Sequence, residues 1–113
     1  MGTRMVSLSI APREVLERLM SEIEGDVIHH ELHALADQRE FGSIVLNRYT
    51  SRPKGLSILI VNVNNIRGGT SAVIITECCG KEWLNDDEWE EEEGIFDEMM
   101  DILDAYILDI CEI

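Results

Sequence analysis

The sequence predicts an α+β domain in which a twisted antiparallel sheet carries two helices packed on one face. Several segments alternate apolar and polar residues with the period of a strand, and two others repeat apolar residues at helical spacing. Short turns join three consecutive strand segments, which is typical of an antiparallel meander. We therefore expect the order β-α-β-β-β-β-α in a single domain spanning residues 1–113.

The N-terminal quarter predicts a strand followed by a helix. Residues 4–10, RMVSLSI, alternate cleanly, and Pro12 suits the first turn of a helix because its φ is fixed and it lacks an N–H. Gly25 is a natural stop. The helix would bury one stripe: Val15, Leu16, Leu19, Met20 and Ile23.

Residues 27–37, VIHHELHALAD, fit two structures. As a helix, Ile28, Leu32 and Leu35 would align on one side. As a strand, apolar and polar residues would divide between two faces. We expect a strand, because a second helix here would leave the following strands less covered by an antiparallel neighbour.

Three further strands are expected at residues 41–49, 56–65 and 70–79, with Gly42 marking a bulge. The middle segment, LSILIVNVNN, is aliphatic on both of its faces. It should therefore be a central strand, and the second face of the sheet needs a cover. Either a homodimer buries that face, or the sheet curls around an internal cavity.

The last third of the chain predicts an acidic segment at residues 82–93 that leads into the C-terminal helix, expected at residues 95–113. Asn85 followed by Glu88 fits a helix cap with a capping box, and the acids at 86–93 suit a helix N-terminus. Gly94 interrupts the pattern, and the alternative is a helix that starts only there. Its apolar stripe would be Ile95, Phe96, Met99, Met100, Leu103, Tyr106, Ile107 and Ile110.

The net charge of −14 lies almost entirely in this last third. Residues 1–76 carry eight acids and eight Lys or Arg, whereas residues 77–113 carry fifteen acids and Lys81 alone. Phosphates would be repelled, so we expect no binding to nucleic acid or to anionic membranes. No apolar run is long enough to span a membrane, and no secretory signal is evident. The expected location is the cytoplasm.

The acidic segment is also the candidate partner-binding site, because tryptophans set among carboxylates can anchor an interface with a basic protein. The alternative is that the tryptophans pack on the sheet and the acids form a solvated face. The candidate residues are Trp83, Asp86, Asp87, Trp89, Glu90, Glu91, Glu92 and Glu93.

His29, Glu31 and His33 would project from one face of a strand at residues 27–37. Imidazole and carboxylate groups are good ligands for zinc, nickel or iron. An HxExH pattern on a strand is a weak signal, and an exposed polar face is the simpler interpretation. We therefore assign no metal ligands and no cofactor.

No catalytic motif is present: no serine stands in GxSxG, and no cysteine has an activating neighbour in sequence. The run NRYTSRPKGLSILIVNVNN, followed by a last strand and a glycine, resembles a family of small uncharacterised bacterial proteins over residues 27–80. That resemblance implies a fold and no activity. Here Cys78-Cys79-Gly80 replaces that family's glycine-rich segment, and the acidic helix is an addition to its pattern.

We expect a small acidic protein that is not an enzyme and acts by association, as a homodimer or with a basic protein. One alternative is a domain that binds a small apolar ligand between the sheet and the C-terminal helix. The other is an acidic inhibitor or immunity-type protein that blocks a cationic surface.

Overall fold

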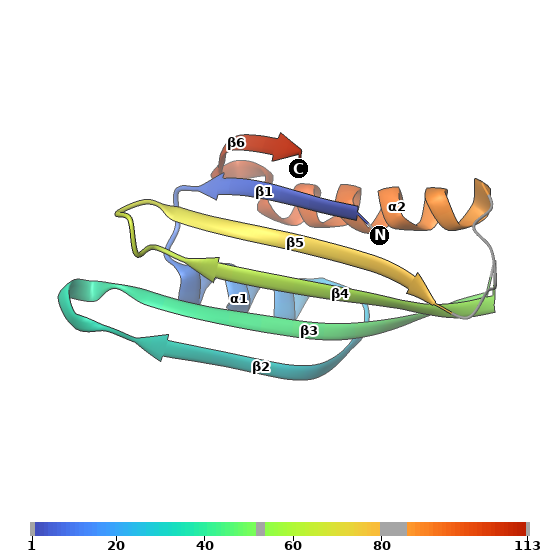
Figure 1. The fold of residues 1–113 in the computed structure, drawn as a ribbon, viewed down its shortest axis with the longest axis horizontal. Coiled ribbons are helices and arrows are strands. Elements are labelled where there is room, and N and C mark those ends of the chain that lie inside the picture. The colour runs from blue at the N-terminus through green and yellow to red at the C-terminus, as the bar shows by residue number, and fades with distance from the viewer. Residues whose placement is uncertain (1, 52–53, 80–85, 113) are drawn as a thin grey trace.

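The computed structural model describes residues 2–51, 54–79 and 86–112, with the backbone alone at 49–51, 54–56, 78–79, 86–93 and 112. Two short 3-10 turns lie at Ala36–Gln38 and Asp104–Tyr106. The elements are, in chain order, β1 (Gly2–Leu8), α1 (Pro12–Glu22), β2 (Asp26–Ala34), β3 (Glu40–Ser51), β4 (Lys54–Asn64), β5 (Thr70–Cys79), α2 (Asp86–Leu103) and β6 (Ile107–Glu112) (Figure 1).

The strands form one six-stranded sheet with the order β2-β3-β4-β5-β1-β6, and every neighbouring pair is antiparallel. The predicted α+β class with an antiparallel sheet is confirmed. Strands β2 to β5 follow one another as a meander, and β1 returns beside β5. Strands β2 and β6 are therefore the two edges of the sheet.

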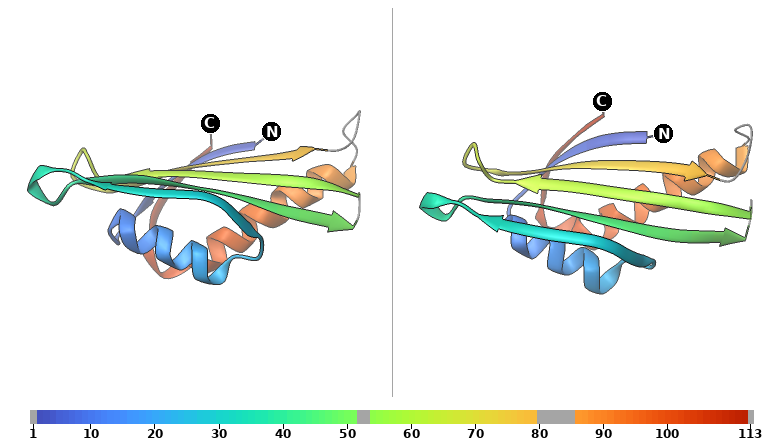
Figure 2. Two further views of the ribbon diagram at one scale, coloured as in Figure 1. Left: turned by 90° about the horizontal axis from the view of Figure 1, so that it is seen from below. Right: turned by 60° about the horizontal axis from the view of Figure 1, so that its bottom comes forward.

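The core lies between the sheet and the helices. Ile44, Val61 and Ile74 are direct neighbours on β3, β4 and β5, and all three are fully buried. Apolar residues of both helices join the same core: Val15, Leu16, Leu19, Ile95, Phe96, Met99 and Leu103. Helix α1 contacts β3 and β4, α2 contacts β5, and the helices contact each other. Figure 2 shows both helices below the sheet in its left view.

Residues 27–37, which fitted both a strand and a helix, are a strand up to Ala34. The hairpin from β2 to β3 then turns through Asp37 and Gln38, whose φ angles are 61° and 63°. The Arg39 N–H donates to the Ala36 carbonyl, which closes the turn. Two consecutive positive φ angles match the twist of an antiparallel hairpin, although glycine or asparagine adopts them at lower cost.

The C-terminal helix starts at the earlier of the two expected positions, and its expected end at residue 113 is wrong. Helix α2 begins at Asp86, runs through Gly94 without a break, and ends at Leu103. Residues Ile107–Glu112 instead form β6, which pairs with β1. The outer backbone groups of β1 find partners this way, and β-branched Ile107 and Ile110 suit a strand. The predicted order therefore lacks the final strand.

Gly42 does not mark a bulge in β3. The register shift between β2 and β3 lies at Val27 and His29, on the other strand. A Cβ at Gly42 would lie 2.5 Å from the Glu31 carbonyl oxygen and 2.8 Å from Leu16 Cδ1. Glycine is needed here because the backbone of β2 and the side chains below it approach too closely for any side chain.

Arg48 ties together three parts of the chain. Its guanidinium Nε and Nη2 donate to the Glu24 carbonyl oxygen over 3.0 and 2.9 Å, and Nη2 also pairs with the Glu98 carboxylate. The Glu24 N–H donates to the same carboxylate over 3.3 Å. The loop after α1 and the second half of α2 are thus both fixed to β3.

Candidate interaction surface

The side chains of the predicted partner-binding residues are not among those that the structure describes. Trp83 lies outside the described residues, and Asp86, Asp87, Trp89 and Glu90–Glu93 belong to a part of α2 where only the backbone is described. The structure adds that positions 86–93 are helical. Their proposed role in partner binding stays a prediction.

His29, Glu31 and His33 come together on the open side of β2, away from the helices. His29 Nε2 lies 3.4 Å and His33 Nε2 lies 3.6 Å from the same Glu31 oxygen, Oε2. Ser43 on β3 donates its hydroxyl to Oε1 of Glu31 over 3.5 Å. Hydrogen bonds from His29 and His33 hold the pKa of the Glu31 carboxyl below its ordinary value.

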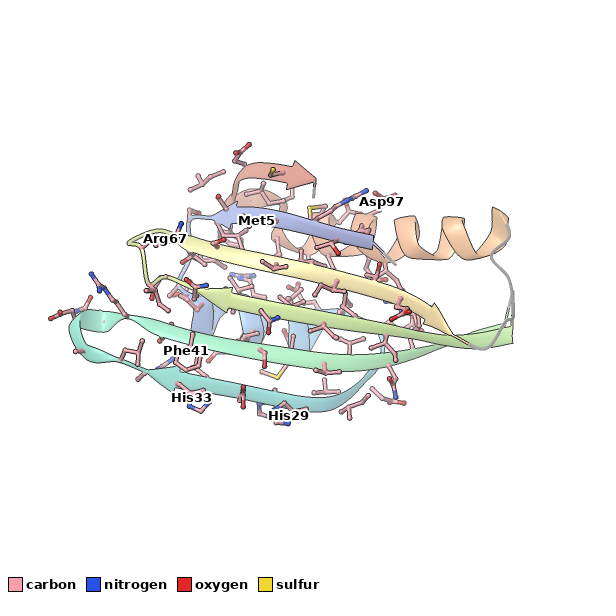
Figure 3. The ribbon with its side chains drawn as sticks, in the orientation of Figure 1. Met5, His29, His33, Phe41, Arg67 and Asp97 are labelled. Carbon is pink, nitrogen blue, oxygen red and sulfur yellow. The ribbon has the colours of Figure 1, made fainter. Side chains whose placement is uncertain are left out.

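The ring of His33 also stacks on Phe41, the first apolar residue of β3, with the ring centroids 4.8 Å apart (Figure 3). The imidazole rings of His29 and His33 therefore lie on either side of the Glu31 carboxylate, along the strand. Within the described ranges, no group of three His, Cys, Asp or Glu could hold a metal ion.

β2 itself is an unprotected edge. All nine of its residues are exposed, and it pairs only with β3. Val27, Ile28 and Leu32 expose 40%, 57% and 36% of their surface. Natural edge strands are usually shielded by proline, lysine or a bulge. β2 contains neither residue, and its register shift lies near its first end.

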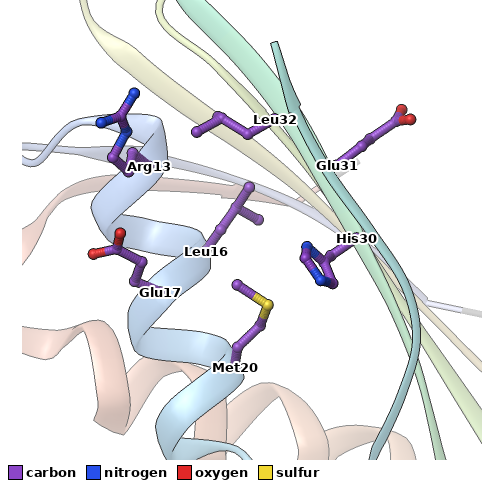
Figure 4. A pocket seen from close by; sticks show the side chains of 7 residues that line it. All are labelled: Arg13, Leu16, Glu17, Met20, His30, Glu31 and Leu32. Atoms are coloured by element: carbon purple, nitrogen blue, oxygen red, sulfur yellow. The ribbon is translucent and has the colours of Figure 1, made fainter.

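A pocket of about 350 Å³ opens between α1 and this edge (Figure 4). Leu16 and Met20 of α1 face His30 and Leu32 of β2 across it, with Arg13 and Glu17 beside it on the helix. The predicted pocket was to lie beneath the C-terminal helix. The half of α2 with described side chains fills the core instead with Phe96 and Met99. A pocket beneath the preceding half stays a prediction.

The first turn of α1 is capped from a distance by Glu40, which the sequence did not single out. Its Oε1 accepts the Arg13 N–H over 2.9 Å, although the two residues are 27 positions apart. The Glu40 N–H donates to Asn65 Oδ1 over 2.7 Å. Glu40 thus links the start of α1 to the start of β3 and to Asn65, which follows β4. The spacing of residues along the chain could not predict this contact.

On the face of the sheet away from the helices, the middle strands β3, β4 and β5 carry few charged side chains. Val45, Ile60 and Ile75 form one row across β3, β4 and β5 and are half-buried. In these three strands, Glu77 is the single charged side chain described on that face. The prediction that β4 is apolar on both faces is confirmed, because Leu59 and Val61 on the other face are buried.

No model of a protein family matches the chain, and no curated protein is similar to it. The resemblance over residues 27–80 to a family of small bacterial proteins therefore stays a prediction. None of the helices in the described part of the chain is long and apolar enough to cross a membrane.

Proposed function

We propose that the protein acts by association, without catalysis, and that its partner is a second copy of the same chain. One observation carries the proposal. Four of the large apolar side chains exposed in the described part of one copy lie on the edge strand β2 or directly after it: Val27, Ile28, Leu32 and Leu35. The others are Met5, Phe41, Ile66, Leu108 and Ile110. Grouped exposed apolar surface on a sheet is typical of a protein interface.

The charge distribution favours a second copy over a basic partner at this surface. The middle strands carry a single described charge on their uncovered face, and ten of the fifteen acids of residues 77–113 belong to α2. We infer that both helices cover one face of the sheet. Helix α2 packs on β5, three strands from the edge strand β2, so two copies can meet at that edge without bringing the acidic helices together.

The absence of recognisable catalytic motifs supports the non-enzymatic part of the proposal. A basic protein bound by Trp83 and the acids at 86–93 remains the second candidate. Its attraction would be largely electrostatic, so that binding should weaken steeply as salt is raised.

Sedimentation velocity over a wide range of protein concentration tests the proposal. We expect a species of twice the chain mass of 12.8 kDa that dissociates on dilution. Apolar contact should keep the dimer intact when salt is raised, whereas a dimer held by charge would dissociate. A single species of one chain mass at every concentration would overturn the proposal.

A further inference from the structure

The exposed apolar side chains are densest at one edge of the sheet. Val27, Ile28 and Leu32 belong to β2, and Leu35 follows it directly. The opposite edge, β6, is shorter and presents Asp109 in its middle. An acid there would face like charge if two copies of β6 paired. The two edges are therefore not equivalent as contact surfaces.

We propose that two copies of the chain join through β2, pairing antiparallel about His30 into a continuous sheet. This inference rests on the proposed self-association and assigns it a surface. β2 runs from Asp26 to Ala34, so His30 is its central residue. Pairing centred there spans the strand, including the register shift at Ile28, and places His29 of each copy opposite Glu31 of the other.

This register also gives complementary side chains. On the open side, His29 of each copy lies opposite Glu31 of the other. The Glu31 carboxylate therefore gains an imidazole neighbour from the other copy, in addition to His29 and His33 of its own chain. Centring the pairing on Glu31 would set that carboxylate against its own copy, which is unfavourable. Centring it on His29 or Leu32 would shorten the paired segment. The complementary hydrogen-bonding groups of His29 and Glu31 and the greatest length thus select the same register.

Ile28 is the residue at the register shift of β2 and has no partner on β3. The same register places it at the level of Leu32 of the other copy. Leu32 lines the pocket between α1 and β2, together with Leu16 and Met20. The aliphatic side chain of Ile28, more than half exposed in one copy, therefore comes to the mouth of the partner's apolar pocket. The occupant of this pocket is then the second copy.

Charge exchange tests the register. His29→Glu sets two carboxylates opposite each other in both symmetric contacts, and Glu31→His sets two imidazoles there. Each variant alone should raise the dimer dissociation constant at least about tenfold. An equimolar mixture of the two should form a heterodimer with near wild-type affinity, because every opposed pair is again a carboxylate with an imidazole. Failure of the mixture to recover affinity would overturn the register.

Matched variants test the surface. Ile28→Lys on β2 should dissociate the dimer, whereas Leu108→Lys on the β6 edge and Ile60→Lys on the open face should leave it intact. Circular dichroism checks that each variant is folded. If Ile60→Lys or Leu108→Lys dissociates the dimer and Ile28→Lys does not, the β2 interface is wrong while self-association stands. If the wild-type chain is monomeric throughout, the proposed function itself fails.

Discussion

Substituting alanine for Gly42 gives a sharp test of how closely β2 and α1 approach β3. The new Cβ would lie 2.5 Å from the Glu31 carbonyl oxygen, 2.8 Å from Leu16 Cδ1 and 3.2 Å from Leu32 Cδ1. The first contact is with backbone, which cannot rotate away, so β2 must move. Inserting a methyl group into such a site costs about 1–3 kcal/mol.

For a chain of 113 residues, the entropy of unfolding makes each kcal/mol worth about 4 °C in Tm. We therefore expect Gly42→Ala to lower Tm by about 4–12 °C. Differential scanning calorimetry at one fixed protein concentration measures this, since dimer dissociation contributes to Tm.

Gly94→Ala is the matched control. A Cβ at Gly94 meets no atom within 4 Å, and the residue lies inside α2. Replacing an exposed helical glycine by alanine should stabilise the protein by about 0.5–1 kcal/mol. Opposite signs for the two substitutions are expected. An unchanged or raised Tm for Gly42→Ala would refute the close approach of β2 to β3 at this position.

Three further predictions concern single contacts. Gln38→Gly should raise the urea midpoint, with a gain of about 0.5–1 kcal/mol, because glycine adopts the positive φ of 63° without strain; a lower midpoint would contradict the turn geometry. Arg48→Met should cost about 1–3 kcal/mol by leaving the Glu24 carbonyl and the Glu98 carboxylate without their donor. The stability of Arg48→Lys should lie between those of wild type and Arg48→Met. Equal stability of these three proteins would contradict the contact. Glu31→Gln tests pH dependence by urea denaturation at several pH values. The lowered pKa of Glu31 in the folded state stabilises the protein above the pKa of the unfolded chain, and this contribution disappears as pH falls through the folded pKa. The stabilities of wild type and Glu31→Gln should therefore converge in acid, and a constant difference would count against the contacts from His29 and His33.

Alternation along the chain predicted β1, and β-branched and aliphatic runs between turns predicted β3, β4 and β5. Residues 27–37 fitted a helix as well as a strand, and the strand was expected because the sheet needs an antiparallel neighbour. These patterns could not predict β6. Residues 107–112 carry enough aliphatic side chains to extend the stripe of α2, and only the outer backbone groups of β1 decide in favour of a strand. Local pattern contains no information about that distant partner.

The candidate surface was only partly predictable. The two-residue spacing of His29, Glu31 and His33 was sufficient to expect them on one face, and the structure brings them together. That β2 lies at an edge depends on the strand order, which places β1 beside β5 rather than beside β2. The pocket lined by Leu32 depends on where α1 packs against the sheet. The periodicity of the sequence does not show this position. Aliphatic residues on both faces of residues 27–35 were the available signal.

The oligomeric state of the wild-type chain in solution tests the central claim most directly. Sedimentation velocity, run from sub-micromolar to high micromolar protein, should show a reversible equilibrium between species of one and two chain masses, the chain mass being 12.8 kDa. The account predicts that the larger species dominates at the highest concentration and that Ile28→Lys removes it. A wild-type chain that sediments as a monomer throughout this range would contradict the account.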